Sequence, residues 1–151
     1  MDIKSEIQKF QQNKLLRNSN EINAFELAIE NIVSLKDVKL VKDLCSGFDD
    51  QTEDHEVMFG LVHAIEDFEA KEGLFEMAKS IPSMLPHAKE WATILNYRVL
   101  NHEPSRKLYI KVLSKLDSTN KDTIVGIIKE IKDEDPARFE NSANEVLTNI
   151  K

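Results

Sequence analysis

Glycine and proline are scarce in this sequence, and their scarcity argues against an all-β fold. Among 151 residues there are four of each. A β-sandwich or barrel needs a turn about every 8–12 residues, built from clusters of Gly, Pro, Asn and Asp. We therefore expect a fold with few tight turns.

Cysteine and long apolar runs are also nearly absent. Cys45 is the single cysteine, so no internal disulfide can form, and no Cys and His residues stand at zinc-ligand spacing. No apolar run approaches the ~20 residues that span a bilayer, and the first residues lack the apolar core of a signal peptide. These features predict a soluble protein of a reducing compartment, the cytoplasm.

A basic stripe or Arg-rich segment is missing as well. The formal net charge is −7, from 20 basic and 27 acidic residues. Proteins that bind nucleic acids neutralise phosphates with Lys and Arg, and anionic membranes attract basic segments. Direct contact with a nucleic acid or a membrane is therefore not expected.

The negative charge is concentrated in one segment. Residues 43–72 contain ten acids and one base, whereas the rest of the chain has 17 acids and 19 bases. Such an acidic segment favours a cationic protein partner, which long-range attraction would steer toward it. The alternative is a solvated acidic face that only maintains solubility.

Enough apolar material is present for one folded domain. Hydrophobic residues make up 41% of the chain and charged residues 31%, a balance too apolar for a disordered tail. The length is that of a single domain, so we assign residues 1–151 to one helical domain.

Apolar residues recur at three- and four-residue intervals along almost the whole chain, which predicts an all-α fold. Boundaries at capping residues give about eight or nine amphipathic helices. This number is too large for a four-helix bundle and favours antiparallel pairs in an α-solenoid-like array, similar to HEAT or armadillo repeats. A compact orthogonal helical bundle is the alternative.

Local signals place some of the helix boundaries. Thr52 is the expected N-cap of a central helix, with Glu53 and Asp54 in its first turn. Pro82 and Pro86 are expected to bracket a tight connection between two helices, with Pro86 opening the second.

Two glycines and the single tryptophan have expected structural roles. Gly47 is expected to adopt the left-handed conformation after a short helix, and Gly60, inside the central helix, predicts close approach by a neighbouring backbone. Trp91 falls on the apolar stripe of its helix, which favours a place in the core over a role as an interface anchor.

No catalytic or metal-binding motif stands out. A calcium-loop pattern fails because Asp54 stands where the loop requires Gly, and Gly60 where it requires Glu. On a helix His63 would meet Glu66 or Asp67, and such a pair is as readily a surface contact as a ligand pair. We therefore expect no enzyme activity, no metal and no cofactor.

Three parts of the sequence carry a resemblance to a known family. They are residues 44–50 (LCSGFDD), residues 56–66 (EVMFGLVHAIE), and Trp91 followed by residues 98–101 (RVLN). On these residues the chain resembles the immunity protein 30 family of bacterial polymorphic toxin systems, with a likeness over roughly residues 20–130.

The resemblance implies a mostly α-helical protein that is encoded beside a toxin and blocks that toxin in the producing cell. Such a protein needs no catalytic residues; it binds the toxin domain, of a contact-dependent or LXG-type system, and occludes its active surface. A nuclease toxin would be basic, because it holds phosphates. The alternative function is a helical-repeat scaffold or adaptor that binds a peptide or a regulatory protein.

We expect the acidic segment to supply the toxin contact. The expected partner-binding residues lie at the start of the central helix and farther along it: Asp49, Asp50, Glu53, Asp54, Glu56, His63, Glu66 and Asp67. For single members the alternative is a local role, in which Asp49 or Asp50 caps the helix and Glu66 or Asp67 pairs with a lysine of an adjacent helix.

Overall fold

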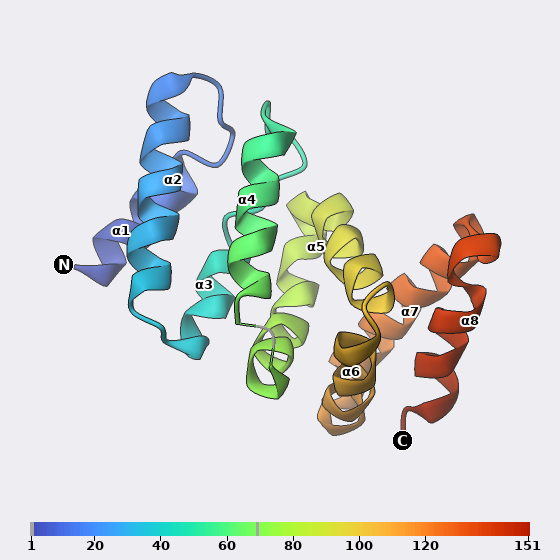
Figure 1. The fold of residues 1–151 in the computed structure, drawn as a ribbon. Coiled ribbons are helices and arrows are strands. Elements are labelled where there is room, and N and C mark those ends of the chain that lie inside the picture. Colours follow the sequence, from blue (N-terminus) through green and yellow to red (C-terminus); the bar gives the residue numbers. More distant parts are fainter. Residues whose placement is uncertain (1, 69) are drawn as a thin grey trace.

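The computed structural model describes residues 2–68 and 70–151, which form helices joined by short loops (Figure 1). Within these residues there are eight α-helices, one 3-10 helix and no strand, so the predicted all-α fold is confirmed. None of these helices has the length and apolar character needed to cross a membrane. The helices are α1 (Ile3–Gln12), α2 (Ser19–Ser34), η1 (Val38–Leu40), α3 (Val41–Cys45), α4 (His55–Glu66), α5 (Lys71–Leu100), α6 (Glu103–Lys115), α7 (Ser118–Glu134) and α8 (Pro136–Asn149).

The helices cross the molecule in chain order, from α1 and α2 at one end to α8 at the other (Figure 1). α2 lies beside α4, and α3 packs against α5. α6 and α7 both pack against α5, and α8 packs against α6 and α7. Each helix therefore contacts mainly its near neighbours in the chain. The solenoid-like array of antiparallel pairs stays a prediction.

Most of the helices begin at a side chain that caps their first turn. A side-chain oxygen or ring nitrogen accepts a hydrogen bond from a backbone N–H that has no partner inside the helix. The capping residues are Asp2, Asn18, Asp37, Asp54, His102, Asp117 and Asp135.

The central helix, α4, begins later than predicted. Asp54 rather than Thr52 caps it, because Asp54 Oδ1 accepts a hydrogen bond from the Val57 N–H at 3.0 Å. The preceding residue is tied to the N-terminal part of the chain, since the Glu53 N–H donates to the Leu15 carbonyl at 2.8 Å. The predicted cap at Thr52 is therefore wrong, and Glu53 and Asp54 stand before the first turn instead of in it.

Pro82 and Pro86 do not bracket a connection. α5 runs through both prolines, and its helical geometry is interrupted at Ala88, where φ is −142° and ψ is 37°. Proline lacks the N–H that bonds to the carbonyl four residues earlier, and its ring crowds that carbonyl. The predicted boundary is therefore wrong in position, because the chain leaves the helical conformation just after Pro86.

Trp91 lies in the core close to this break. Its side chain is only 1% exposed. Phe48 and His55 stack against it with ring centroids 5.7 and 5.8 Å away, and Phe59 meets it edge-on at 5.2 Å. The prediction that Trp91 is a core residue is confirmed.

Gly47 has a packing role and not the predicted left-handed conformation. No glycine of the described residues has a positive φ. A Cβ at Gly47 would lie 2.0 Å from Cζ of Phe10, a fully buried ring that stacks on Phe25 with centroids 4.8 Å apart. Glycine at this position therefore lets the Phe10 ring pack directly against the backbone after α3.

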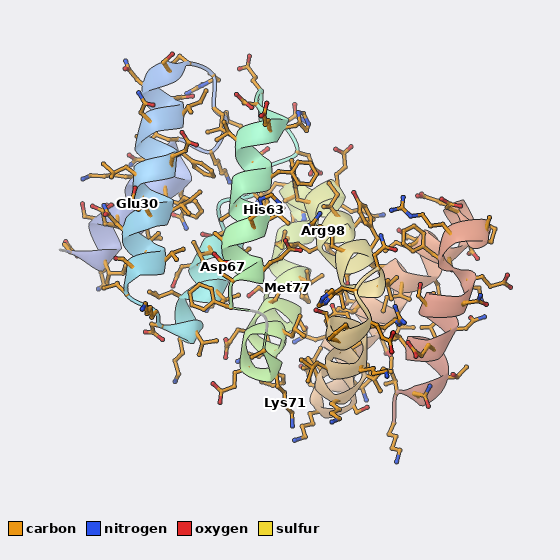
Figure 2. All side chains as sticks on the ribbon, viewed as in Figure 1. Glu30, His63, Asp67, Lys71, Met77 and Arg98 are labelled. Atoms are coloured by element: carbon orange, nitrogen blue, oxygen red, sulfur yellow. The ribbon has the colours of Figure 1, made fainter. Side chains whose placement is uncertain are left out.

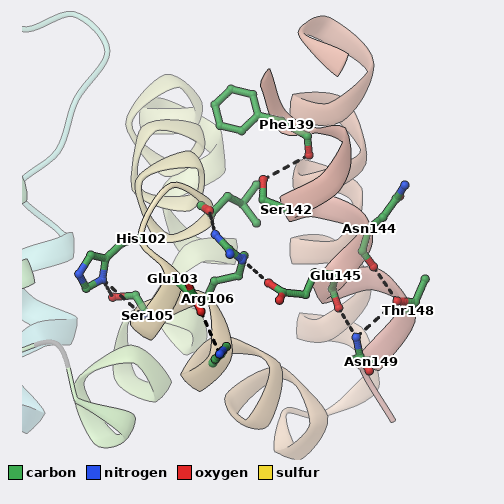
Figure 3. Close-up of polar contacts among 12 residues, drawn as sticks. His102, Glu103, Ser105, Arg106, Phe139, Ser142, Asn144, Glu145, Thr148 and Asn149 are labelled. Carbon is green, nitrogen blue, oxygen red and sulfur yellow. Dashed lines mark hydrogen bonds and ion pairs between the residues drawn. The ribbon is translucent and has the colours of Figure 1, made fainter. Parts of the chain in front are cut away.

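Polar contacts fasten the C-terminal helices together (Figure 3). Arg106 of α6 donates from Nη1 to the Leu100 carbonyl at 2.6 Å, and its Nε donates to Glu145 of α8. His102 Nδ1 lies 2.6 Å from Ser105 Oγ at the start of α6. One guanidinium thus joins the end of α5 to α6 and α8.

Replacing Gly47 by Ala should destabilise the protein, because the new Cβ would overlap a buried ring. Overpacking of this kind costs about 1–3 kcal/mol of unfolding free energy. Gly126→Ala is the matched control: a Cβ at Gly126, inside α7, would meet nothing within 4 Å. Ala is favoured over Gly in a helix by about 1 kcal/mol, so the control should be stabilised. Urea denaturation measures both shifts, and equal shifts would contradict the packing at Gly47.

The Cys45 thiol should be unreactive in the folded protein. Its side chain is 1% exposed, and burial raises its pKa to about 12. Ellman's reagent should modify it only after unfolding. An unfolded thiol has a pKa of ~8.5. Burial of the neutral Cys45 thiol therefore contributes fully to stability below that pH, and the contribution is lost as the pH rises toward the pKa in the folded protein. The Cys45→Ala variant should lose less stability than the unmodified protein as the pH rises over this range. Rapid labelling of Cys45 in the native protein would contradict its burial.

Candidate partner-binding surface

The acidic segment extends from α3 through a loop and α4 to the start of α5. The predicted partner-binding residues within it divide into two groups by environment. Asp49, Asp50, Asp54 and Glu66 bond to other parts of the protein, whereas Glu53, Glu56, His63 and Asp67 are exposed on α4 and just before and after it.

Asp49 stabilises the loop before α4. Its Oδ1 accepts a hydrogen bond from the Gln51 N–H at 2.8 Å, and its Oδ2 lies 3.5 Å from Nζ of Lys14. The side chain is 14% exposed. Asp49 therefore adds little free charge to the surface.

Asp50 clamps the break in α5. Its N–H donates to the His87 carbonyl at 2.9 Å, and its Oδ2 accepts a hydrogen bond from the Glu90 N–H at 3.2 Å. These two backbone groups lie on either side of Ala88, where the helical geometry is interrupted. Backbone groups at a helix end lack partners within the helix, and Asp50 supplies one on each side. It acts as an N-cap for the second half of α5.

Asp54 and Glu66 hold the two ends of α4. Asp54 is its N-cap. Glu66 pairs with Arg98 of α5 through two bonds, Nε to Oε2 at 2.7 Å and Nη2 to Oε1 at 2.8 Å. A planar guanidinium fits a carboxylate well in this geometry. The local alternative for Glu66 thus applies, with an arginine in place of the expected lysine.

An exposed stripe along α4 consists of Glu56, Gly60 and His63, and Asp67 continues it directly after the helix. Their spacings of four, three and four residues put them on one face of the helix. Within the described part of the chain, no hydrogen bond or ion pair engages the side chains of Glu56, His63 and Asp67. Their charges and polar atoms therefore face solvent.

Glu53 adds negative charge near the N-terminal helices. It is exposed, and it contributes to a raised pKa of Arg17, which is caused mainly by the hydrogen bond and ion pair of Arg17 with Glu21 at 2.7 Å. Arg17 pairs with Glu21, so Glu53 keeps its negative charge exposed on this part of the surface.

A groove of about 280 Å³ lies between α2 and α4, and we refer to it as the α2–α4 groove. Half-buried Ile29, Val33 and Val57 and the buried Ala64 form its floor. Figure 2 shows Glu30 on α2, His63 on α4 and Asp67 at the end of α4. The exposed residues at the edges of the groove are Glu26, Glu30, His63 and Asp67.

Glu26 and Glu30 are two acidic members of this surface that the charge pattern did not indicate, because they lie outside residues 43–72. Both are exposed, and neither has a hydrogen bond or ion pair with the described residues. Their spacing of four residues on the polar side of α2 is the signal that could have identified them. The acidic surface therefore extends over two helices.

The predicted close approach of a backbone to Gly60 is wrong. A Cβ at Gly60 would meet nothing within 4 Å, and the residue lines the α2–α4 groove. A glycine inside a helix costs about 1 kcal/mol relative to Ala. No contact among the described residues accounts for the glycine, and its missing side chain leaves the groove open.

The α2–α4 groove combines exposed carboxylates at its edges with an apolar floor. In residues 2–68 and 70–151, no group of three His, Cys, Asp or Glu side chains could hold a metal ion. Exposed carboxylates around an apolar floor can bind a basic partner through both charge attraction and apolar contact.

Replacing Asp50 by Ala should destabilise the protein, because the second half of α5 loses its cap. Loss of a capping side chain costs about 0.5–2 kcal/mol. Asp67→Ala removes an acid that no described residue engages, so it should change the unfolding free energy by less than about 0.5 kcal/mol. Thermal denaturation compares the two variants. Equal losses would show that Asp50 does not clamp the break.

The segments that carry the family resemblance meet where α4 packs against α5. Phe48 and Phe59 come from the first two segments, and both contact Trp91. Glu66 from the second segment pairs with Arg98 from the third. The motif thus describes one junction in space, although its parts are far apart in the sequence.

Comparison with known proteins identifies the family. The family model Immunity protein 30 matches residues 12–109, which include the acidic segment and the whole α2–α4 groove. No curated protein and no solved structure matches the chain. Because the match covers more than half of its length, the chain belongs to the immunity protein 30 family.

Proposed function

We propose that this protein binds the toxin domain encoded beside it and neutralises that domain by occluding its active surface, without chemistry of its own. Family membership carries the proposal, since the match to Immunity protein 30 covers residues 12–109. An inhibitor of this kind requires a stable, accessible surface and no reactive group.

The exposed acids of α4 and the preceding loop suit a basic toxin. Glu53, Glu56 and Asp67 supply carboxylates, and His63 stands between the last two as a polar contact. A toxin that cleaves nucleic acid carries basic residues because it holds phosphates. Attraction between the two surfaces would raise the association rate and weaken as salt increases.

The other predicted residues support the toxin contact indirectly, because they fix the position of α4. Asp49 and Asp50 fix the loop before α4, Asp54 caps the helix, and Glu66 ties its end to α5. Their charges are largely engaged inside the protein. In the proposal they hold α4 in place, and the exposed residues touch the toxin.

Co-expression with the neighbouring toxin domain tests the function. We expect this chain to restore growth of cells that produce the toxin domain, and to form a stable complex with it in a pull-down. Growth arrest in the presence of the folded protein, together with no complex, would contradict the proposal.

Reversing two exposed acids should slow association. Glu53→Lys combined with Glu56→Lys should lower the association rate at low salt by about tenfold or more, because long-range attraction is lost. The difference should shrink as the salt concentration rises. Stopped-flow mixing with the toxin domain measures both.

The matched control places the same charge change outside the family match. Asp133→Lys combined with Glu140→Lys alters exposed acids of α7 and α8, beyond residues 12–109. Its association rate should stay within about threefold of the unmodified protein, as for acids distant from an interface. An equal slowing by both double variants would show that net charge alone, and not this surface, guides the toxin.

A further inference from the structure

We infer that the α2–α4 groove receives a basic amphipathic helix of the toxin domain, with apolar side chains on the groove floor and Lys or Arg side chains at its edges. This inference rests on the proposed function and specifies the docking site and the chemistry of the toxin segment that enters it.

The walls of the groove favour a helix as its occupant. α2 and α4 lie side by side (Figure 1), and residues of both helices line the groove. An amphipathic helix can bind such a groove with apolar side chains that recur at three- and four-residue intervals. Ile29 and Val33 from α2, with Val57 and Ala64 from α4, offer the apolar surface for these side chains.

Gly60 allows the backbone of the incoming helix to approach α4. Nothing lies within 4 Å of the place where its Cβ would be. At Gly47 and Gly73 the corresponding space is already filled, by the Phe10 ring and by the Phe68 carbonyl oxygen. Gly60 therefore differs from these two glycines, because the space that its missing side chain leaves is not filled by the described chain and is open to a partner.

The edges of the groove require positive charge in the partner. Glu26 and Glu30 stand one turn apart on α2, and Asp67 directly follows α4. No described residue neutralises these three carboxylates. Lys and Arg can lay their methylene stems along an apolar floor while their charged ends reach a carboxylate at the edge.

Leu27 adds an exposed apolar side chain to α2, beside groove-lining residues in the sequence but not itself lining the groove. Its side chain is 57% exposed, and it lies on α2 between Glu26 and Glu30 in the sequence. Within the described residues, the exposed large hydrophobic side chains are Leu27 and Leu35, which is 46% exposed at the end of α2. An apolar residue among carboxylates suits a basic amphipathic helix, whereas a nucleic acid would be repelled by the acids.

Filling the groove tests the inference. Gly60→Gln adds a long, uncharged side chain inside the groove and replaces glycine by a residue that favours helix. Its affinity for the catalytically inactivated toxin domain, measured by isothermal titration calorimetry, should fall by about 30-fold or more, as for a change at the centre of an interface.

Gly126→Gln is the matched control. Gly126 is also an open helical glycine, but it lies in α7, which packs against α5 and α8. This variant should bind the toxin domain within about threefold of the unmodified protein, as for a site outside the interface. Circular dichroism should show that both variants remain helical.

A charge variant keeps the test decisive if Gly60→Gln loses its fold. Glu26→Lys combined with Glu30→Lys changes two exposed acids without partners among the described residues, and it should weaken binding at low salt by about tenfold or more. If Gly60→Gln folds and its affinity is unchanged, the groove is not the docking site. If Gly60→Gln does not fold, unchanged affinity of the charge variant leads to the same conclusion. Either result leaves the proposed function intact. If the unmodified protein itself fails to bind the toxin domain, the proposed function fails with it.

Discussion

The break in α5 at Ala88 is the constraint on which the arrangement of the central helices depends. The second half of α5 keeps its direction because Asp50 bonds to the backbone on both sides of the break. Trp91 follows directly and packs against rings from the preceding loop and from α4. Farther along, the pair of Glu66 and Arg98 fixes the end of α4 to α5. These contacts hold α4 in the position in which it lies beside α2 and forms the groove.

The packing of the central helices around the break in α5 also explains why some carboxylates of the acidic segment are bonded within the protein and others are exposed. The carboxylates of Asp49, Asp50 and Glu66 form hydrogen bonds or ion pairs with other parts of the protein. Glu56 on α4 and Asp67 directly after it are exposed and keep their charge for solvent or for a partner. The acids concentrated in this part of the sequence therefore divide into internal fastening groups and an exposed acidic surface, and only the structure separates the two.

The sequence predicts what depends on local patterns and misses what depends on distant contacts. Helical periodicity indicates the all-α fold, and the apolar stripe places Trp91 in the core. The start of α4 and the break in α5 escape prediction because Glu53 bonds to Leu15 and Asp50 bonds to His87, across long stretches of chain. The groove escapes it for the same reason, since its second acidic edge comes from α2. Charge counted along the chain could not show that this helix lies beside α4.

Amide hydrogen exchange of the complex with the toxin domain tests the central claim most directly. The claim is that the surface formed by α2 and α4 binds the toxin, while α7 and α8 lie outside the interface. Exchange should slow across α2 and α4 when the toxin domain binds, with little change in α7 and α8, because amides covered by a partner open to solvent less often. Protection confined to α7 and α8, with α2 and α4 unchanged, would contradict the account.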